Sequence, residues 1–150
     1  MENTLSSALS VTRIIVTWES RWPLNIYRDA DEAKLSAGMR QRLADAEQMT
    51  IDDYRRGILE RERGRAIYAA LLDEGVDACI TLSANGPAPI GLASTGDPGF
   101  ATPCAYLGVP ALSLPLLTFE GLPVGIQLMG FRDRDADLCA IAASIQQHLG

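Results

Sequence analysis

The stretch VPALSLPLLTFEGLPVGIQLM, residues 109–129, decides the fold of this chain. It contains two apolar runs, 109–117 and 122–129, and the four residues 118–121 between them suit a turn. The stretch therefore predicts a β-hairpin. A proline cannot donate a ladder hydrogen bond, so we expect three prolines at strand ends, edges or bulges: Pro110, Pro115 and Pro123.

Both runs lack a clean alternation of apolar and polar residues. Near-continuous apolar runs are typical of strands that are buried on both faces. Residues 78–82 predict a further short strand, and the long segment 84–102 between this strand and the hairpin predicts a loop. Doubly buried strands need layers above and below and neighbours at their edges. A chain of 150 residues hardly provides them, so we expect this sheet to be part of a larger one supplied by another segment or chain.

Charge and turn residues divide the chain into three parts. Eleven of the 13 Lys and Arg residues lie within 13–65, whereas 66–131 has none and holds most of the prolines and glycines. We expect residues 1–75 to be helical, 76–131 to form strands and loops, and 132–150 to form a final amphipathic helix that covers one face of the sheet.

The front part predicts three helices. The first covers 6–21 and is expected to end before Pro23, and the second covers 35–47. The third starts after Thr50, which suits an N-cap, and ends near Gly75. Three helices followed by strands and a last helix place the chain in the α/β class.

The third helix carries two features of interest. Asp53 lies three residues after the predicted cap, as in a capping box. Arg61, Glu62 and Arg65 interrupt its apolar face. Two readings are open: a pair of guanidinium groups aimed at a carboxylate of a ligand, or an internal Glu–Arg pair with aliphatic stems lying on the surface.

Composition excludes several classes of function. The formal net charge of −6 disfavours nucleic acid and anionic lipid as partners. No apolar run reaches the length of a membrane span, and the first residues do not resemble a signal peptide, so we expect a cytoplasmic protein without a membrane contact. The three scattered cysteines contain no CxxC pair, so we expect neither disulfides nor a bound metal: Cys79, Cys104 and Cys139.

No catalytic constellation is apparent in the sequence. The only histidine, His148, lies at the end of the chain. The only lysine, Lys34, follows two acidic residues at a predicted helix start, where we expect it to be solvent-exposed. The pair Ser6-Ser7 suits a helix cap better than a nucleophile. No glycine-rich phosphate loop occurs either. The small polar segment 94–100 suits a turn, or a nest of backbone N–H groups that holds an anion.

Several segments together resemble one known family. The sequence GLPVGIQLMG at 121–130 resembles the LPxGxQxxG signature near the end of amidase signature enzymes. Further segments resemble that family in the same order along the chain: the helical segments with Leu35-Ser36, Asp53-Tyr54 and 60–63, the strand 77–81, the loop 94–98 with Phe100, and the GxPaxsxP strand at 107–115.

The resemblance implies the C-terminal part of an α/β/α fold with a mixed sheet, which is incomplete in this chain. Amidase signature enzymes use a Ser–Ser–Lys triad, which lies in the first half of the family's fold, and neither its serines nor its lysine has a counterpart here. The resemblance therefore implies no catalytic residue and no cofactor. It implies five substrate-pocket residues: Thr95, Gly96, Asp97, Phe100 and Cys104. Ala101 stands where the family often has Asn.

Three functions follow, in order of preference. The first is a C-terminal fragment of an amidase, a hydrolase of C–N bonds, that is inactive alone and meets a small-molecule amide only when an N-terminal catalytic segment completes it. The second is a non-catalytic partner that completes or regulates an amidase or amidotransferase subunit, either as a homo-oligomer or with an N-terminal half. The third is a stand-alone binding module that uses the loop 94–104.

Overall fold

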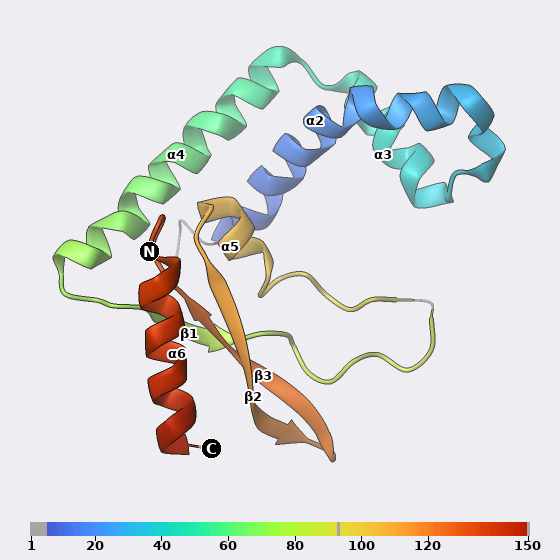
Figure 1. Ribbon diagram of the computed structural model, residues 1–150. Helices are drawn as coiled ribbons and strands as arrows, with labels where there is room; N and C mark the ends of the chain where they lie inside the picture. Colours follow the sequence, from blue (N-terminus) through green and yellow to red (C-terminus); the bar gives the residue numbers. More distant parts are fainter. Residues whose placement is uncertain (1–5, 93, 150) are drawn as a thin grey trace.

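The computed structural model describes residues 6–92 and 94–149, which fold into a helical part and a small sheet (Figure 1). Its elements, in chain order, are α2 (Ala8–Asp31), η1 (Glu32–Lys34), α3 (Ala37–Gln48), α4 (Ile51–Asp73), β1 (Cys79–Leu82), α5 (Thr102–Leu107), β2 (Ala111–Phe119), β3 (Leu122–Met129) and α6 (Asp135–Leu149).

The first helix is longer than predicted. α2 continues through Pro23 to Asp31, so the prediction that it ends before this proline is wrong. Pro23 has no N–H for the carbonyl of Glu19, and Figure 1 shows the second half of α2 turned away from the first half. The second half contacts α3, where Arg28 Nη2 donates to Glu47 Oε1 over 2.6 Å.

The next two helices begin at side-chain caps. Ser36 Oγ accepts from the N–H of Met39, which starts α3 two residues later than predicted. Thr50 Oγ1 accepts from the N–H of Asp53, and the N–H of Thr50 donates to Asp53 Oδ2 over 2.8 Å. This reciprocal pair is the predicted capping box. Gly75, at φ +83°, follows the end of α4 as predicted.

The sheet is antiparallel, with strand order β1-β3-β2. β3 has the predicted bounds and the hairpin is confirmed, but its turn is shorter than the predicted 118–121. Thr118 and Phe119 still pair with β3, so only Glu120 and Gly121, both at positive φ, form the turn. β2 begins two residues later than predicted because Val109 still donates its N–H to Cys104 of the preceding helix. Pro115 lies at a register shift between Leu114 and Leu117 on an edge strand, as expected for proline.

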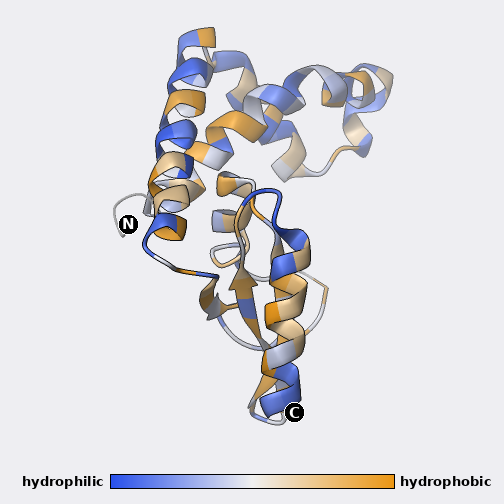
Figure 2. Cartoon of the chain, turned by 60° about the vertical axis from the view of Figure 1, so that its left-hand side comes forward, coloured by the Kyte–Doolittle hydropathy of each residue, from blue (hydrophilic) through white to orange (hydrophobic). Residues whose placement is uncertain are grey.

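The helix α6 covers one face of this sheet, as predicted. Its Leu138 and Ala142 pack with Leu114 and Leu128 in a buried cluster. The strands extend beyond this cover, and Figure 2 shows hydrophobic residues along them. Five large apolar side chains of the strands are exposed: Ile80, Leu82, Leu117, Phe119 and Leu122. Within the described residues, the chain therefore does not bury its strands on both faces.

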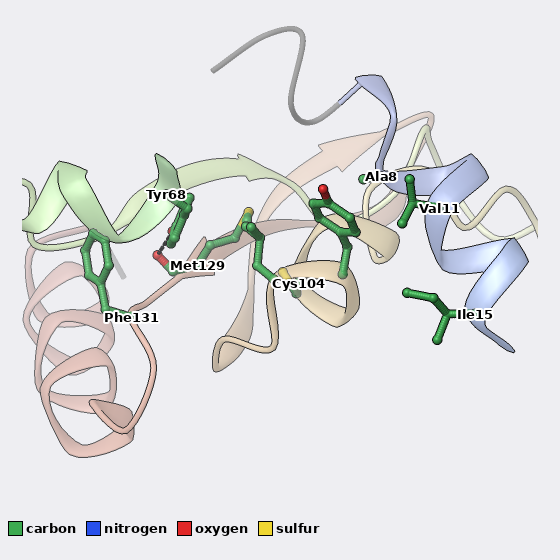
Figure 3. Packing of buried hydrophobic residues seen from close by; sticks show 9 residues of the cluster. Ala8, Val11, Ile15, Tyr68, Cys104, Met129 and Phe131 are labelled. Atoms are coloured by element: carbon green, nitrogen blue, oxygen red, sulfur yellow. Dashed lines mark hydrogen bonds between the residues drawn. The ribbon is translucent and has the colours of Figure 1, made fainter. Parts of the chain in front are cut away.

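A second buried cluster joins the helices to the end of β3 (Figure 3). Tyr68 of α4 donates its hydroxyl to the carbonyl of Met129 over 3.1 Å, and its ring lies 5.1 Å from that of Phe131. The short helix α5, which the sequence analysis did not predict, enters this cluster through Cys104 and Leu107. This cluster fixes the sheet and α5 relative to α4.

Candidate functional site

The loop between β1 and α5 carries three of the predicted site residues at its exposed surface, namely Thr95, Gly96 and Asp97. Asp97 organises this loop. Its Oδ1 accepts from the N–H of Gly99 over 2.8 Å, and its Oδ2 accepts from Asn85 Nδ2 over 3.0 Å. The carboxylate thus joins the outgoing and returning arms of the loop, which extends away from α6 (Figure 1). Both of its oxygens are therefore used inside the loop.

Gln127 of β3 fastens the end of this loop to the sheet. Its Nε2 donates to the carbonyl of Phe100 over 2.9 Å, and Gln127 is 7% exposed. A further turn follows, in which Thr102 donates both its N–H and its hydroxyl to the carbonyl of Pro98. The position of Phe100 is therefore set by a buried side chain of the central strand.

Beside this contact lies a cavity of about 240 Å³. Phe100 is the one predicted site residue that lines it, together with Pro103 of α5, Tyr68 of α4 and the strand residues Cys79, Ile80, Thr81 and Met129. The wall is mostly apolar, which suits the carbon part of a ligand and offers few groups that hold a charge.

Cys104, the fifth predicted site residue, lies in the buried cluster around Tyr68 and Met129 (Figure 3). It is 7% exposed, and burial raises the pKa of its thiol. Burial also raises the pKa of Tyr68, whose hydroxyl is engaged with the carbonyl of Met129. Both groups are thus neutral near pH 7 and serve packing in this chain. The structure brings Thr95, Gly96 and Asp97 together and places Cys104 apart from them.

A pair of serines lies on the same face of the sheet as Gln127, and the sequence did not predict it. Ser83 Oγ and Ser113 Oγ lie 2.6 Å apart, above Gly125 of the central strand. A Cβ at Gly125 would lie 2.3 Å from Ser113 Oγ, so only glycine leaves room for this pair. The spacing of Gly125 and Gln127 was the signal in the sequence that could have indicated this site. Residues two apart on a strand share a face, so the glycine opens space beside Gln127.

This serine pair has no base. A nucleophilic serine needs a neighbouring base, and in the described part of the chain the side-chain partner of each hydroxyl is the other serine. Lys34 is exposed and lies 3.3 Å from Asp31, while His148 Nδ1 contacts the carbonyl of Ser144 in α6. Among the residues described, no group of His, Cys, Asp and Glu is suited to hold a metal ion.

The charged residues that interrupt the apolar face of α4 form an internal pair. Arg65 Nη1 lies 2.8 Å from Glu62 Oε1, and Arg65 Nε donates to the carbonyl of Leu107 over 2.8 Å. Arg61 Nε lies 3.9 Å from Glu62. The structure therefore favours the internal Glu–Arg pair for Arg65, whereas the buried Nε of Arg61 has no hydrogen-bond partner among the described residues.

Comparisons with known proteins give matches to curated sequences and to solved structures. The chain is 47% identical over 45 residues to one subunit of the glutamyl-tRNA(Gln) amidotransferase of Chlamydia trachomatis serovar L2, a match that covers 29% of this chain and 9% of that protein. Chlamydia muridarum has a relative with the same figures. No protein-family model matches the chain.

The similarity to solved structures covers nearly the whole chain. A crystal structure of an amidase matches 97% of it with 28% identity and a TM-score of 0.86. A 6-aminohexanoate cyclic dimer hydrolase matches 97% with 19% identity and a TM-score of 0.82. A bacterial aryl acylamidase that belongs to the amidase signature enzymes matches 92% with 17% identity and a TM-score of 0.67. This chain spans only 36%, 36% and 32% of these three chains, respectively.

Proposed function

We propose, from the premise that this chain has the fold of about a third of an amidase signature enzyme, that it is a non-catalytic portion of an amidase and is inactive alone. One observation carries the proposal. The apolar strands are left partly uncovered in a chain that spans 36% of the amidase it matches. The longer relatives have the additional polypeptide that such a sheet needs.

The chemistry of the described side chains supports inactivity alone. Amide hydrolysis requires an activated nucleophile and donors for the oxyanion. Ser83 and Ser113 bond to each other, and Lys34 is held at the surface beside Asp31. The role that remains for this chain is to shape the site and to complete the sheet.

The loop before α5 is the part that we expect to face a small-molecule amide in the completed enzyme. Gln127 fixes the carbonyl of Phe100, and Phe100 lines the cavity beside β1. Thr95 and Gly96 offer polar groups at the exposed side of the same loop. Asp97 holds the two arms of the loop together, and Cys104 supports the loop from the core. In this proposal these residues form one wall of the acyl pocket.

A second candidate is a separate partner of an amidase or amidotransferase subunit. The observation in its favour is the 47% identity over 45 residues to one subunit of a glutamyl-tRNA(Gln) amidotransferase. In this role the chain would complete or regulate a catalytic polypeptide without acting on the amide itself.

We place either role in the cytoplasm. The cysteines at 79, 104 and 139 are free thiols, which suits a reducing compartment. None of the helices in the described part of the chain combines the length and the apolar character of a membrane span.

Co-expression tests the proposal. The solved amidase that is 28% identical to this chain is produced without its matched stretch, and this chain is expressed beside it. We expect ammonia release from aliphatic and aryl amides only when both polypeptides are present. Each polypeptide alone is the control. Turnover by this chain alone would overturn the proposal. Failure of the two polypeptides to associate would overturn it as well. So would a stable complex that hydrolyses none of the amides that the intact amidase hydrolyses.

A further inference from the structure

A cavity of about 350 Å³ lies between the second half of α4 and the segments that pack against it. Phe100 does not line this cavity, and the proposed function does not use it. Its volume is in the range of about 300–1,000 Å³ that small-molecule sites in proteins have. Six apolar side chains form most of its wall: Ala66, Ala69 and Leu72 of α4, and Leu107, Val109 and Phe131.

Small residues of α4 leave this space open. Ala66 and Ala69 lie three positions apart, so they share one face of the helix, and both are exposed. Tyr68 also lines the cavity, but its hydroxyl donates to the carbonyl of Met129. This part of the wall therefore has no free polar group and suits the hydrocarbon part of a ligand.

Two arginines give the cavity a positive charge. Arg65 and Arg132 line it together with one acidic residue, Glu62, although the net charge of the chain is −6. These arginines are the basic residues that flank the segment 66–131, which contains none. The fold thus brings to one cavity two guanidinium groups that lie far apart in the sequence.

Arg65 is held in place by its own chain. Its Nε donates to the carbonyl of Leu107, and its Nη1 lies 2.8 Å from Glu62 Oε1. Gly108, at φ +67°, leaves room for this guanidinium, because a Cβ there would lie 2.6 Å from Arg65 Nη2. These contacts leave Nη2 without an acceptor in the described part of the chain.

Arg132 supplies a guanidinium that is not yet used. Its side chain is exposed and has no ion pair or hydrogen bond within residues 6–92 and 94–149, whereas the nearby Arg134 pairs with Asp137. A planar guanidinium binds a carboxylate through two parallel hydrogen bonds. The reading of two guanidinium groups aimed at a carboxylate thus applies to Arg65 with Arg132, and not to Arg65 with Arg61.

We infer that this cavity binds a small monocarboxylic acid with an apolar body. The carboxylate meets Arg132 beside the fixed guanidinium of Arg65, and the hydrocarbon lies between α4 and Phe131. Charge complementarity selects the anion, because a cation would meet two guanidinium groups against one carboxylate and a neutral molecule would gain nothing from Arg132. The inference does not rest on the proposed function, since every residue in it belongs to this chain.

Titration with octanoate tests this inference, and octanol and octylammonium serve as neutral and cationic probes with the same hydrocarbon chain. The full chain is labelled with ¹⁵N and titrated below its unfolding temperature. We expect saturable binding of octanoate with amide shifts at residues 66–72 and 131–132, and binding of the other two probes weaker by at least about tenfold. The amides of Ile80 and Leu82 report any binding to the exposed side chains of β1, and their signals should not move.

Two variant pairs locate the site. Arg132→Gln removes the free charge and should weaken octanoate binding by at least about tenfold, whereas Arg134→Gln changes a neighbouring arginine outside the cavity and should leave it unchanged. Ala69→Leu fills the cavity and should abolish binding. Ala70→Leu makes the same change at an exposed position that does not line the cavity, and it should have no effect. Thermal unfolding identifies any variant that no longer folds.

Several results would overturn this inference. They are octanol or octylammonium binding as tightly as octanoate, amide shifts at Ile80 and Leu82 alone, and an affinity for octanoate that Arg132→Gln leaves unchanged. Titration of the co-expressed complex adds one more, because a loss of binding there would identify the remainder of the amidase as the occupant of the cavity. If the two polypeptides fail to associate, the proposed function is overturned, and the titration of this chain still decides the inference.

Discussion

Ile80 lies directly opposite Leu128 in the pairing of β1 with β3, and the two side chains share one face of the sheet, yet Leu128 is 0% exposed and Ile80 is 65% exposed. The difference comes from α6, whose Leu138 and Ala142 pack with Leu128. A sheet face that is buried at its centre and open at its edge is the feature on which the proposed incompleteness of this chain rests.

This contrast predicts that two truncations lower stability by very different amounts. Leu128→Ala leaves a cavity beneath α6, and we expect it to lower the free energy of unfolding by about 2–5 kcal/mol. Ile80→Ala removes a side chain that is mostly in water in the isolated chain, so its effect should be much smaller. Urea denaturation of both variants measures the difference, and equal losses would contradict the open edge.

Close approach of α5 to α4 predicts the effect of a single methyl group. A Cβ at Gly64 would lie 2.4 Å from Tyr106 Oη and 2.6 Å from its ring, and Tyr106 is 1% exposed. We therefore expect Gly64→Ala to destabilise the chain by about 1–3 kcal/mol. Gly38→Ala, on α3, is the matched control, since nothing lies within 4 Å of its Cβ and alanine favours a helix. Thermal unfolding of the two variants should shift in opposite directions.

The hydrogen bond from Gln127 to Phe100 predicts that β3 orders the candidate loop. Gln127→Met keeps a side chain of similar length but removes the donor, and it leaves the carbonyl of Phe100 unpaired. We expect hydrogen exchange of residues 94–101 to become faster, with a loss of about 1 kcal/mol in the free energy of unfolding. Exchange of this segment is followed by mass spectrometry, with α6 as the internal reference. Unchanged exchange would show that the loop is held by other contacts.

The capping box at the start of α4 predicts a pH dependence. Hydrogen bonds from the side chain and then the backbone of Thr50 lower the pKa of Asp53, and the nearby Arg56 contributes as well. A carboxyl group whose pKa is lowered by folding stabilises the chain above its unfolded pKa, and this contribution is lost as the pH falls through the folded pKa. Thr50→Ala should cost about 1 kcal/mol near neutral pH.

The lowered pKa of Asp53 also predicts that Asp53→Asn makes stability less dependent on pH in the acid range. Thermal unfolding of this variant and of the unchanged chain is compared at neutral pH and in the acid range of carboxyl groups. The difference between them should be largest near neutral pH and shrink in acid. A difference that does not vary with pH would contradict the role assigned to the carboxylate.

The sequence predicted the elements whose signals are local. The cap at Thr50, the glycine after α4 and the hairpin before β3 each depend on residues within a few positions of one another. Each was found, although the hairpin turn is two residues shorter than predicted. The predicted end of α2 was wrong: the helix continues beyond Pro23, and this second half meets α3 in a contact between Arg28 and Glu47, which lie 19 positions apart. α5 was missed although Pro103 near its start and Gly108 at its end are the usual boundary residues of a helix.

The residues of the candidate site were harder to predict from the sequence than the helices and strands. The resemblance selected a continuous loop, whereas the cavity is lined by Phe100 together with residues from α4, α5 and two strands. The pairing of Ser83 with Ser113 depends on strand register across 30 positions, which no local pattern specifies. The exposure of Ile80 could not be predicted from the sequence either. An apolar residue in a strand does not indicate whether the same chain covers the sheet face on which it lies.

Unfolding of the isolated chain, compared with the same chain in the co-expressed complex, tests the claim that this sheet needs polypeptide outside the chain. Near-ultraviolet circular dichroism and binding of a hydrophobic dye are followed during heating. We expect the isolated chain to unfold at low temperature with strong dye binding, and the same chain in the complex to unfold at higher temperature with little dye binding. A monomer that binds no dye and unfolds at the same temperature as the complex would contradict this claim.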